Sequence, residues 1–79
     1  MGPQRAVAVL DYEVSQPFPD FDGLEPYGRA DILCRLHGRP LGFISVPVVA
    51  AHVRRQDVVR ELLERHAWAL AVARAEAML

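Results

Sequence analysis

The sequence has no lysine and no threonine, and it has only two serines and one cysteine among its 79 residues. The single cysteine, Cys34, excludes an intramolecular disulfide, as is typical of proteins in a reducing compartment such as the cytoplasm. Nucleophilic catalysis needs a serine, cysteine or threonine beside a positioned base. Ser15 and Ser45 lie in no such motif, and Gly-x-Ser-x-Gly is absent. We therefore expect no catalytic residue and no self-sufficient enzyme in this chain.

The chain also lacks an excess of charge of either sign. Nine basic residues against ten acidic residues give a net charge of −1, a balance that attracts neither nucleic acid nor an anionic membrane. All nine basic residues are arginine, which we interpret as the mark of a GC-rich coding genome. The apolar run that follows the N-terminus, residues 6–10, is too short for a secretory core or a membrane span. We expect neither nucleic acid nor membrane as a partner.

What is present is a globular composition, with 52% hydrophobic and 24% charged residues. A chain of this length holds one small core, so residues 1–79 are interpreted as a single domain. Residues 6–14 alternate, with Leu10 and Tyr12 on one side and Asp11 on the other. This alternation predicts a strand with one apolar and one solvent-exposed face, typical of an antiparallel sheet covered on one side.

Two more strands are expected at residues 30–37 and 41–48, after a proline-rich and acidic loop at residues 15–29. The loop either packs over the core as a belt or carries function. Between the strands, Gly38-Arg39 suits a two-residue type II′ turn and so predicts a β-hairpin.

A helix is expected over residues 57–77, with Asp57 as its N-cap. At about 100° per residue, eight side chains fall on one broad apolar face, namely Val58, Val59, Leu62, Leu63, His66, Ala69, Leu70 and Ala73. These elements predict an α+β fold in which a three-stranded antiparallel sheet with a β-hairpin packs on one C-terminal helix.

A second apolar stripe runs along the opposite side of the helix, at Trp68, Val72, Ala75 and Leu79. A helix that is apolar nearly all round requires cover on two sides, and a chain of this size has little left to supply the second. We therefore predict that this stripe meets another protein domain or a second copy of the chain. The alternative is that this end of the helix folds under the proline-rich loop.

Metal ligands and cofactor motifs are not indicated. Cys34 and His37 are three apart, and such residues on a strand point to opposite faces, so they do not form a zinc pair. His52 and His66 would have to converge from a loop and a helix, and His66 is expected to be a packed histidine with one satisfied nitrogen. Asp20, Asp22 and Glu25 are interpreted as a solvated loop. Phosphate-binding glycine loops are absent. We expect no metal and no cofactor.

Residues 34–47, Cys-Arg-Leu-His-Gly-Arg-Pro-Leu-Gly-Phe-Ile-Ser-Val-Pro, resemble a segment near the start of certain actinobacterial family-2 glycosyltransferases. Those proteins carry a small domain ahead of the catalytic domain. Residues 9–14 and 16–20 are similar to the same domain in order and spacing, so that the resemblance covers about residues 7–50 and includes the hairpin motif His37, Gly38, Arg39 and Pro40. The resemblance implies an accessory domain or a stand-alone relative. The metal-dependent transfer of a sugar from a nucleotide donor would belong to a catalytic domain that this chain does not contain.

The expected function is therefore that of a non-catalytic accessory or protein-interaction module. Two alternatives stay open. One is a stand-alone homodimer, paired through Trp68, Val72 and Leu79 or through a free sheet edge. The other is a small ligand- or metal-binding domain that uses Asp20, Asp22 and His37.

Overall fold

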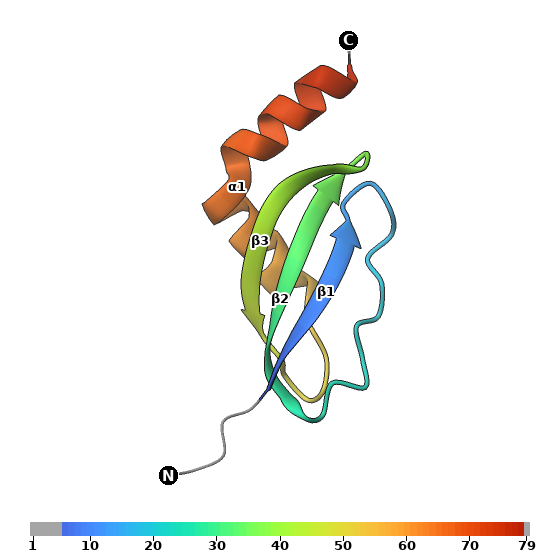
Figure 1. Ribbon diagram of the computed structural model, residues 1–79, viewed down its shortest axis with the longest axis vertical. Coiled ribbons are helices and arrows are strands. Elements are labelled where there is room, and N and C mark those ends of the chain that lie inside the picture. Colours follow the sequence, from blue (N-terminus) through green and yellow to red (C-terminus); the bar gives the residue numbers. More distant parts are fainter. Residues whose placement is uncertain (1–5, 79) are drawn as a thin grey trace.

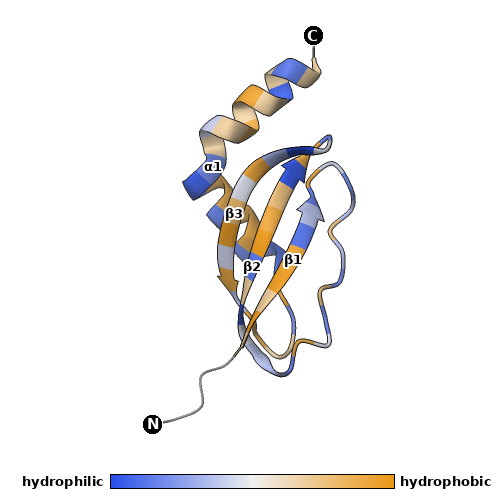
Figure 2. Cartoon of the chain, viewed as in Figure 1, coloured by the Kyte–Doolittle hydropathy of each residue, from blue (hydrophilic) through white to orange (hydrophobic). Residues whose placement is uncertain are grey.

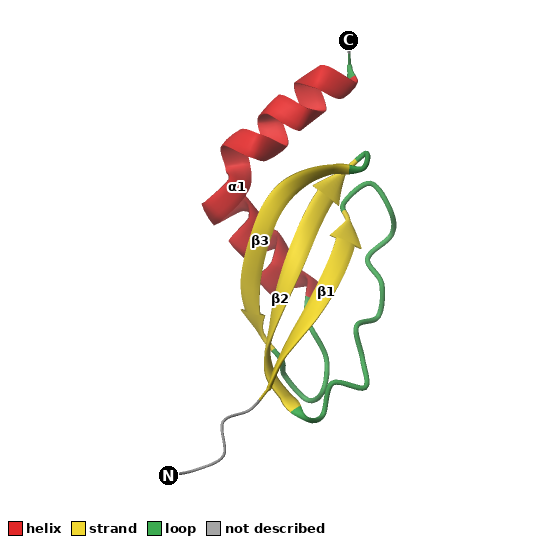
Figure 3. Cartoon of the chain, viewed as in Figure 1, coloured by secondary structure: helices red, strands yellow, loops and turns green. Residues whose placement is uncertain are grey.

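A computed structural model describes residues 6–78 of the chain, which form a three-stranded sheet packed on one C-terminal helix (Figures 1 and 3). The elements are β1 (Ala6–Glu13), β2 (Tyr27–Leu36), β3 (Arg39–Pro47) and α1 (Arg55–Ala77). The predicted α+β class, the hairpin and the C-terminal helix are confirmed. Strand β2 begins three residues earlier than expected, and α1 begins two residues earlier.

The sheet is mixed rather than antiparallel throughout. Its strand order is β1-β2-β3; β2 and β3 form the expected antiparallel hairpin, whereas β1 runs parallel to β2. The loop between β1 and β2 returns along the whole length of the strands before β2 starts (Figure 1). Parallel neighbours need a crossover of about a dozen residues or more, and residues 14–26 provide it. The alternation of apolar and polar residues predicts a strand, but it does not indicate whether that strand runs parallel or antiparallel to its neighbour.

One face of the sheet holds the core. The predicted alternation is confirmed, since Ala30, Ile32 and Cys34 of β2 are fully buried together with Ile44 and Val46 of β3. Figure 2 shows this apolar content along the strands. The opposite face is open to solvent and carries the ion pairs Arg35–Asp11 and Arg29–Asp31 beside exposed apolar side chains, of which Val9 is 73% exposed.

The proline-rich loop packs against the core. The rings of Tyr12, Phe18 and Phe21 stack edge to face, with centroids 5.3 and 5.6 Å apart. The N–H of Leu24 donates to the carbonyl of Ala51, and the N–H of Val53 donates to the carbonyl of Phe21. The loop is therefore tied to the segment that precedes α1. Of the two expected roles, the structure supports packing.

The hairpin turn lies one residue earlier than predicted. His37 and Gly38 both have positive φ, 52° and 79°, which is a type I′ turn rather than a type II′ turn at Gly38-Arg39. The carboxylate of Glu13 accepts hydrogen bonds from the backbone N–H groups of His37 (3.0 Å) and Gly38 (2.6 Å). This capping from the neighbouring strand supports the turn with His37 in the left-handed region.

Helix α1 begins after Arg54, so the prediction of Asp57 as the N-cap is wrong. Asp57 lies in the first turn and is fully buried. Its carboxylate accepts hydrogen bonds from Nε of Arg54 (2.8 Å) and from the guanidinium of Arg60 (2.9 Å). The hydrogen bond from Arg54, ahead of the desolvation that opposes it, lowers the pKa of Asp57. Two arginines thus keep the Asp57 carboxylate ionised, although it is buried in the first turn of α1 rather than placed at the N-cap.

Helix α1 bends at His66, whose φ of −132° and ψ of 24° are not helical. Nε2 of His66 donates to the carbonyl of Phe43 on β3, at 2.7 Å. Gly42 lies under the ring, and a Cβ at that position would be 2.4 Å from Cε1 of His66. The expected packed histidine is confirmed, and its contact with β3 accounts for the bend. The part of α1 before His66 crosses the sheet, and the part after it leaves along β3 (Figure 1).

Candidate docking surface on the C-terminal helix

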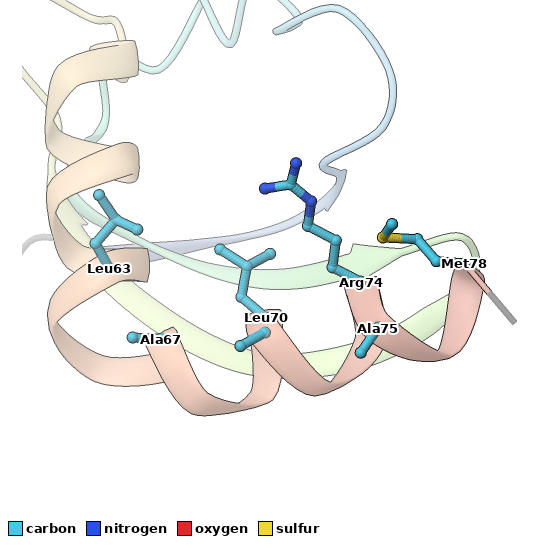
Figure 4. A pocket seen from close by; sticks show the side chains of 7 residues that line it. Leu63, Ala67, Leu70, Arg74, Ala75 and Met78 are labelled. Carbon is cyan, nitrogen blue, oxygen red and sulfur yellow. The ribbon is translucent and has the colours of Figure 1, made fainter.

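The bend divides α1 into two segments, and an open groove of about 360 Å³ lies along the second segment, with Leu63 of the first segment at its end (Figure 4). Six apolar residues line it, namely Leu63, Ala67, Leu70, Ala71, Ala75 and Met78. Arg74 is the one charged residue in the lining. We call this surface the α1 groove.

The apolar side chains around the α1 groove are unusually exposed. Leu63 is 54% exposed, Met78 is 80% exposed and Trp68 is 82% exposed. Trp68 stands three residues from Ala71 and seven from Ala75, positions that share one side of a helix. Trp68 therefore lies on the same side of α1 as these two lining residues. An exposed apolar patch of this kind, containing a tryptophan, is typical of a protein-binding site.

The predicted interaction stripe is located only in part on this surface. Trp68 is solvent-exposed as expected, and Ala75 lines the groove. Val72 is half-buried, and Leu79 lies outside the described residues. Sequence reasoning assigned Leu63 and Leu70 to the core face; Leu63 is exposed, whereas Leu70 packs partly against the core and also lines the groove.

Before the bend, the face of α1 that is buried is narrower than the periodicity predicts. Val58, Leu62 and Ala73 of the expected core face are buried, whereas Val59 and Leu63 remain largely exposed. A periodicity of 100° per residue assumes one straight helix, and the axis changes direction at His66. Met78 was not predicted to line a binding surface, because it belongs to neither of the two apolar stripes that a straight helix would present.

The hairpin motif performs a structural task. His37 and Gly38 form the turn that Glu13 caps, and Arg39 forms an ion pair with Glu76 near the end of α1. The N–H of Gly38, followed by those of Ser15 and His37, lowers the pKa of Glu13 from 4.5 to about 2. Pro40 follows the turn and is exposed.

Reactive groups do not converge elsewhere in the described chain. Across residues 6–78, no three His, Cys, Asp or Glu side chains are placed to hold a metal ion. Burial raises the pKa of the Cys34 thiol to about 11, so the nucleophilic thiolate is scarce at neutral pH. Within the same residues, no helix is both long and apolar enough to span a bilayer.

Comparison with known proteins adds no relative: no family model, no curated protein and no solved structure matches the chain. The α1 groove, with Trp68 on the same side of α1, is the best-defined candidate site on the described residues.

Proposed function

We propose that this chain is a non-catalytic protein-interaction module that docks another protein domain in the α1 groove. The observation that carries the proposal is the groove itself, whose apolar lining includes exposed Leu63 and Met78 and lies on the same side of α1 as exposed Trp68. Burying apolar surface contributes about 25 cal/mol per Å², and tryptophan is enriched among the residues that dominate binding energy. A partner that covers this surface would remove from water the largest exposed side chains of α1.

The likeness of residues 7–50 to the N-terminal domain of family-2 glycosyltransferases favours the catalytic domain of such an enzyme as the partner. In this proposal the partner performs the sugar transfer, and the chain contributes binding and position only. Within residues 7–50, the carboxylate of Glu13 binds the turn His37-Gly38. This contact gives a physical reason why the two motifs occur together in one domain. We also place the chain in a reducing compartment such as the cytoplasm, because one cysteine permits no internal disulfide.

The test is co-purification of the chain with the catalytic domain of a family-2 glycosyltransferase encoded in the same genome. We expect a stable complex that Leu63→Glu abolishes, because the new carboxylate would be buried in an apolar interface. The matched control is Val9→Glu, which places the same charge on an exposed apolar position of the opposite sheet face. Equal loss of the complex in both variants, or no loss in either, would contradict docking through the groove.

Sedimentation of the purified chain separates this proposal from a homodimer. We expect a monomer at concentrations of many micromolar. A dimer that Leu63→Glu dissociates would mean that a second copy, rather than another domain, occupies the groove.

A further inference from the structure

We infer that the α1 groove accepts a helix that presents a carboxylate to Arg74. This inference rests on the proposed function and specifies the chemistry of the partner. Arg74 projects into the angle between the two segments of α1, beside Leu70 (Figure 4). A guanidinium at the margin of an apolar groove selects an occupant that combines an apolar face with a negative charge.

The charges of the chain leave Arg74 available. Glu76 pairs with Arg39, and Glu61 pairs with Arg65. Within residues 6–78, Arg74 takes part in none of the ion pairs. The guanidinium of Arg74 is exposed to solvent and is therefore free to pair with a carboxylate of the occupant.

The same charge argues against a second copy as the occupant. Two α1 grooves placed face to face would bring two apolar linings together, each with an arginine as its one charged member. Like charges in an interface are destabilising. A different protein with an acidic residue in its apolar stripe avoids this repulsion and gains a charge-assisted hydrogen bond.

The spacing of small residues favours a helix as the occupant. Ala67, Ala71 and Ala75 are four apart and form one row along α1, and this row lies between rows of larger side chains. Leu70, Arg74 and Met78 form one flanking row, and Trp68 and Val72 form the other. Helices pack when a ridge of one enters the groove between ridges of its neighbour. The alanine row is such a groove, and it lies within the lining of the measured cavity.

The experiment uses synthetic amphipathic peptides of about five helical turns, with a stripe of leucine and alanine and no tryptophan. One set carries a single glutamate beside the stripe, placed at successive turns, and each peptide has a twin with glutamine at that position. Trp68 is the one tryptophan of the chain, so its fluorescence reports occupation of the groove. Arg74→Gln is the test variant, and Arg65→Gln, on an exposed side chain that pairs with Glu61, is the matched control.

We expect the best glutamate peptide to bind about three- to tenfold more tightly than its glutamine twin, as for a partly desolvated ion pair. This preference should disappear in Arg74→Gln and persist in Arg65→Gln. Equal affinity of the twins, or a preference that survives Arg74→Gln, refutes the inference. In that case Leu63-dependent capture of the glycosyltransferase domain would leave the proposed function standing. Binding by none of the peptides refutes the helical, acidic occupant.

Discussion

The contact between Gly42 and His66 should control both the stability of the domain and the direction of α1. An alanine at position 42 would place its Cβ 2.4 Å from Cε1 and 2.8 Å from Nε2 of the His66 ring, closer than non-bonded atoms approach. It would also hold a β-carbon at φ = +142°, a conformation that side chains rarely adopt. The ring must therefore leave its position, and its hydrogen bond to Phe43 breaks.

The expected cost of Gly42→Ala is about 2 to 4 kcal/mol. Backbone strain at positive φ contributes about 1 to 3 kcal/mol, and the lost hydrogen bond contributes about 1 kcal/mol. Domains are stable by about 0.05 to 0.15 kcal/mol per residue, or about 4 to 12 kcal/mol for this chain. Gly42→Ala thus removes a large share of the stability. For a domain of this size, the melting temperature should fall by roughly 10 to 25 °C.

Urea denaturation followed by circular dichroism measures the free energy of unfolding. The matched control is Gly38→Ala, because Gly38 has φ = +79° with open space where a Cβ would be. It measures the cost of a β-carbon in the left-handed region with no steric contact, about 1 kcal/mol. In the His66→Ala background, the excess cost of Gly42→Ala over Gly38→Ala should shrink. If the two glycine variants are equally stable, the contact with His66 has no energetic weight and the explanation of the bend is wrong.

Three further predictions concern charge and exposure. The pKa of Glu13 is about 2 in the folded chain, against an ordinary value of 4.5. The stabilisation that Glu13 provides is therefore complete above pH 4.5 and is lost as the pH falls towards 2. Glu13→Gln should flatten this part of an acid-denaturation curve, and an unchanged curve would contradict the capping role. Asp57→Ala should lower the free energy of unfolding by about 1 to 3 kcal/mol in urea melts, whereas loss of its partner in Arg60→Ala, at an exposed arginine, should cost less. Trp68→Ala should change that free energy by less than about 0.5 kcal/mol while weakening partner capture, and a large fall in melting temperature would show that Trp68 belongs to the core.

Local patterns in the sequence were sufficient for the elements but not for their pairing. The alternation in residues 6–14 and the hydrophobic period of residues 57–77 identified β1 and α1 because each reports a local repeat. The direction of β1 depends on where residues 14–26 lead the chain, which no local repeat encodes. The cap of α1 was misplaced for a similar reason. A carboxylate near a helix start suits the cap position, but Arg54 and Arg60 provide Asp57 with partners one turn further in.

The docking surface depends on a contact that local reasoning could not supply. Trp68 and Ala75 were identified because they break the one-sided pattern expected of a helix on a sheet. Leu63 was assigned to the core because the apolar face of the helix is broader than the face that packs on the sheet, whereas Leu70 does pack partly against the core. The bend lies at His66, whose ring is adjacent in space to Gly42, 24 positions away in the chain.

The same contact links stability to binding. The α1 groove lies along the second segment of α1 with Leu63 of the first segment at its end, and His66, at the junction, is held by the carbonyl of Phe43. If the ring is displaced in Gly42→Ala, the segments are free to align, and Leu63 moves away from Leu70. The variant should therefore bind the glutamate peptides more weakly even under conditions where it is fully folded, although none of the groove residues has changed. Circular dichroism establishes the folded fraction, and Trp68 fluorescence measures the affinity. Unaltered peptide affinity in the folded variant would show that the groove does not depend on the bend.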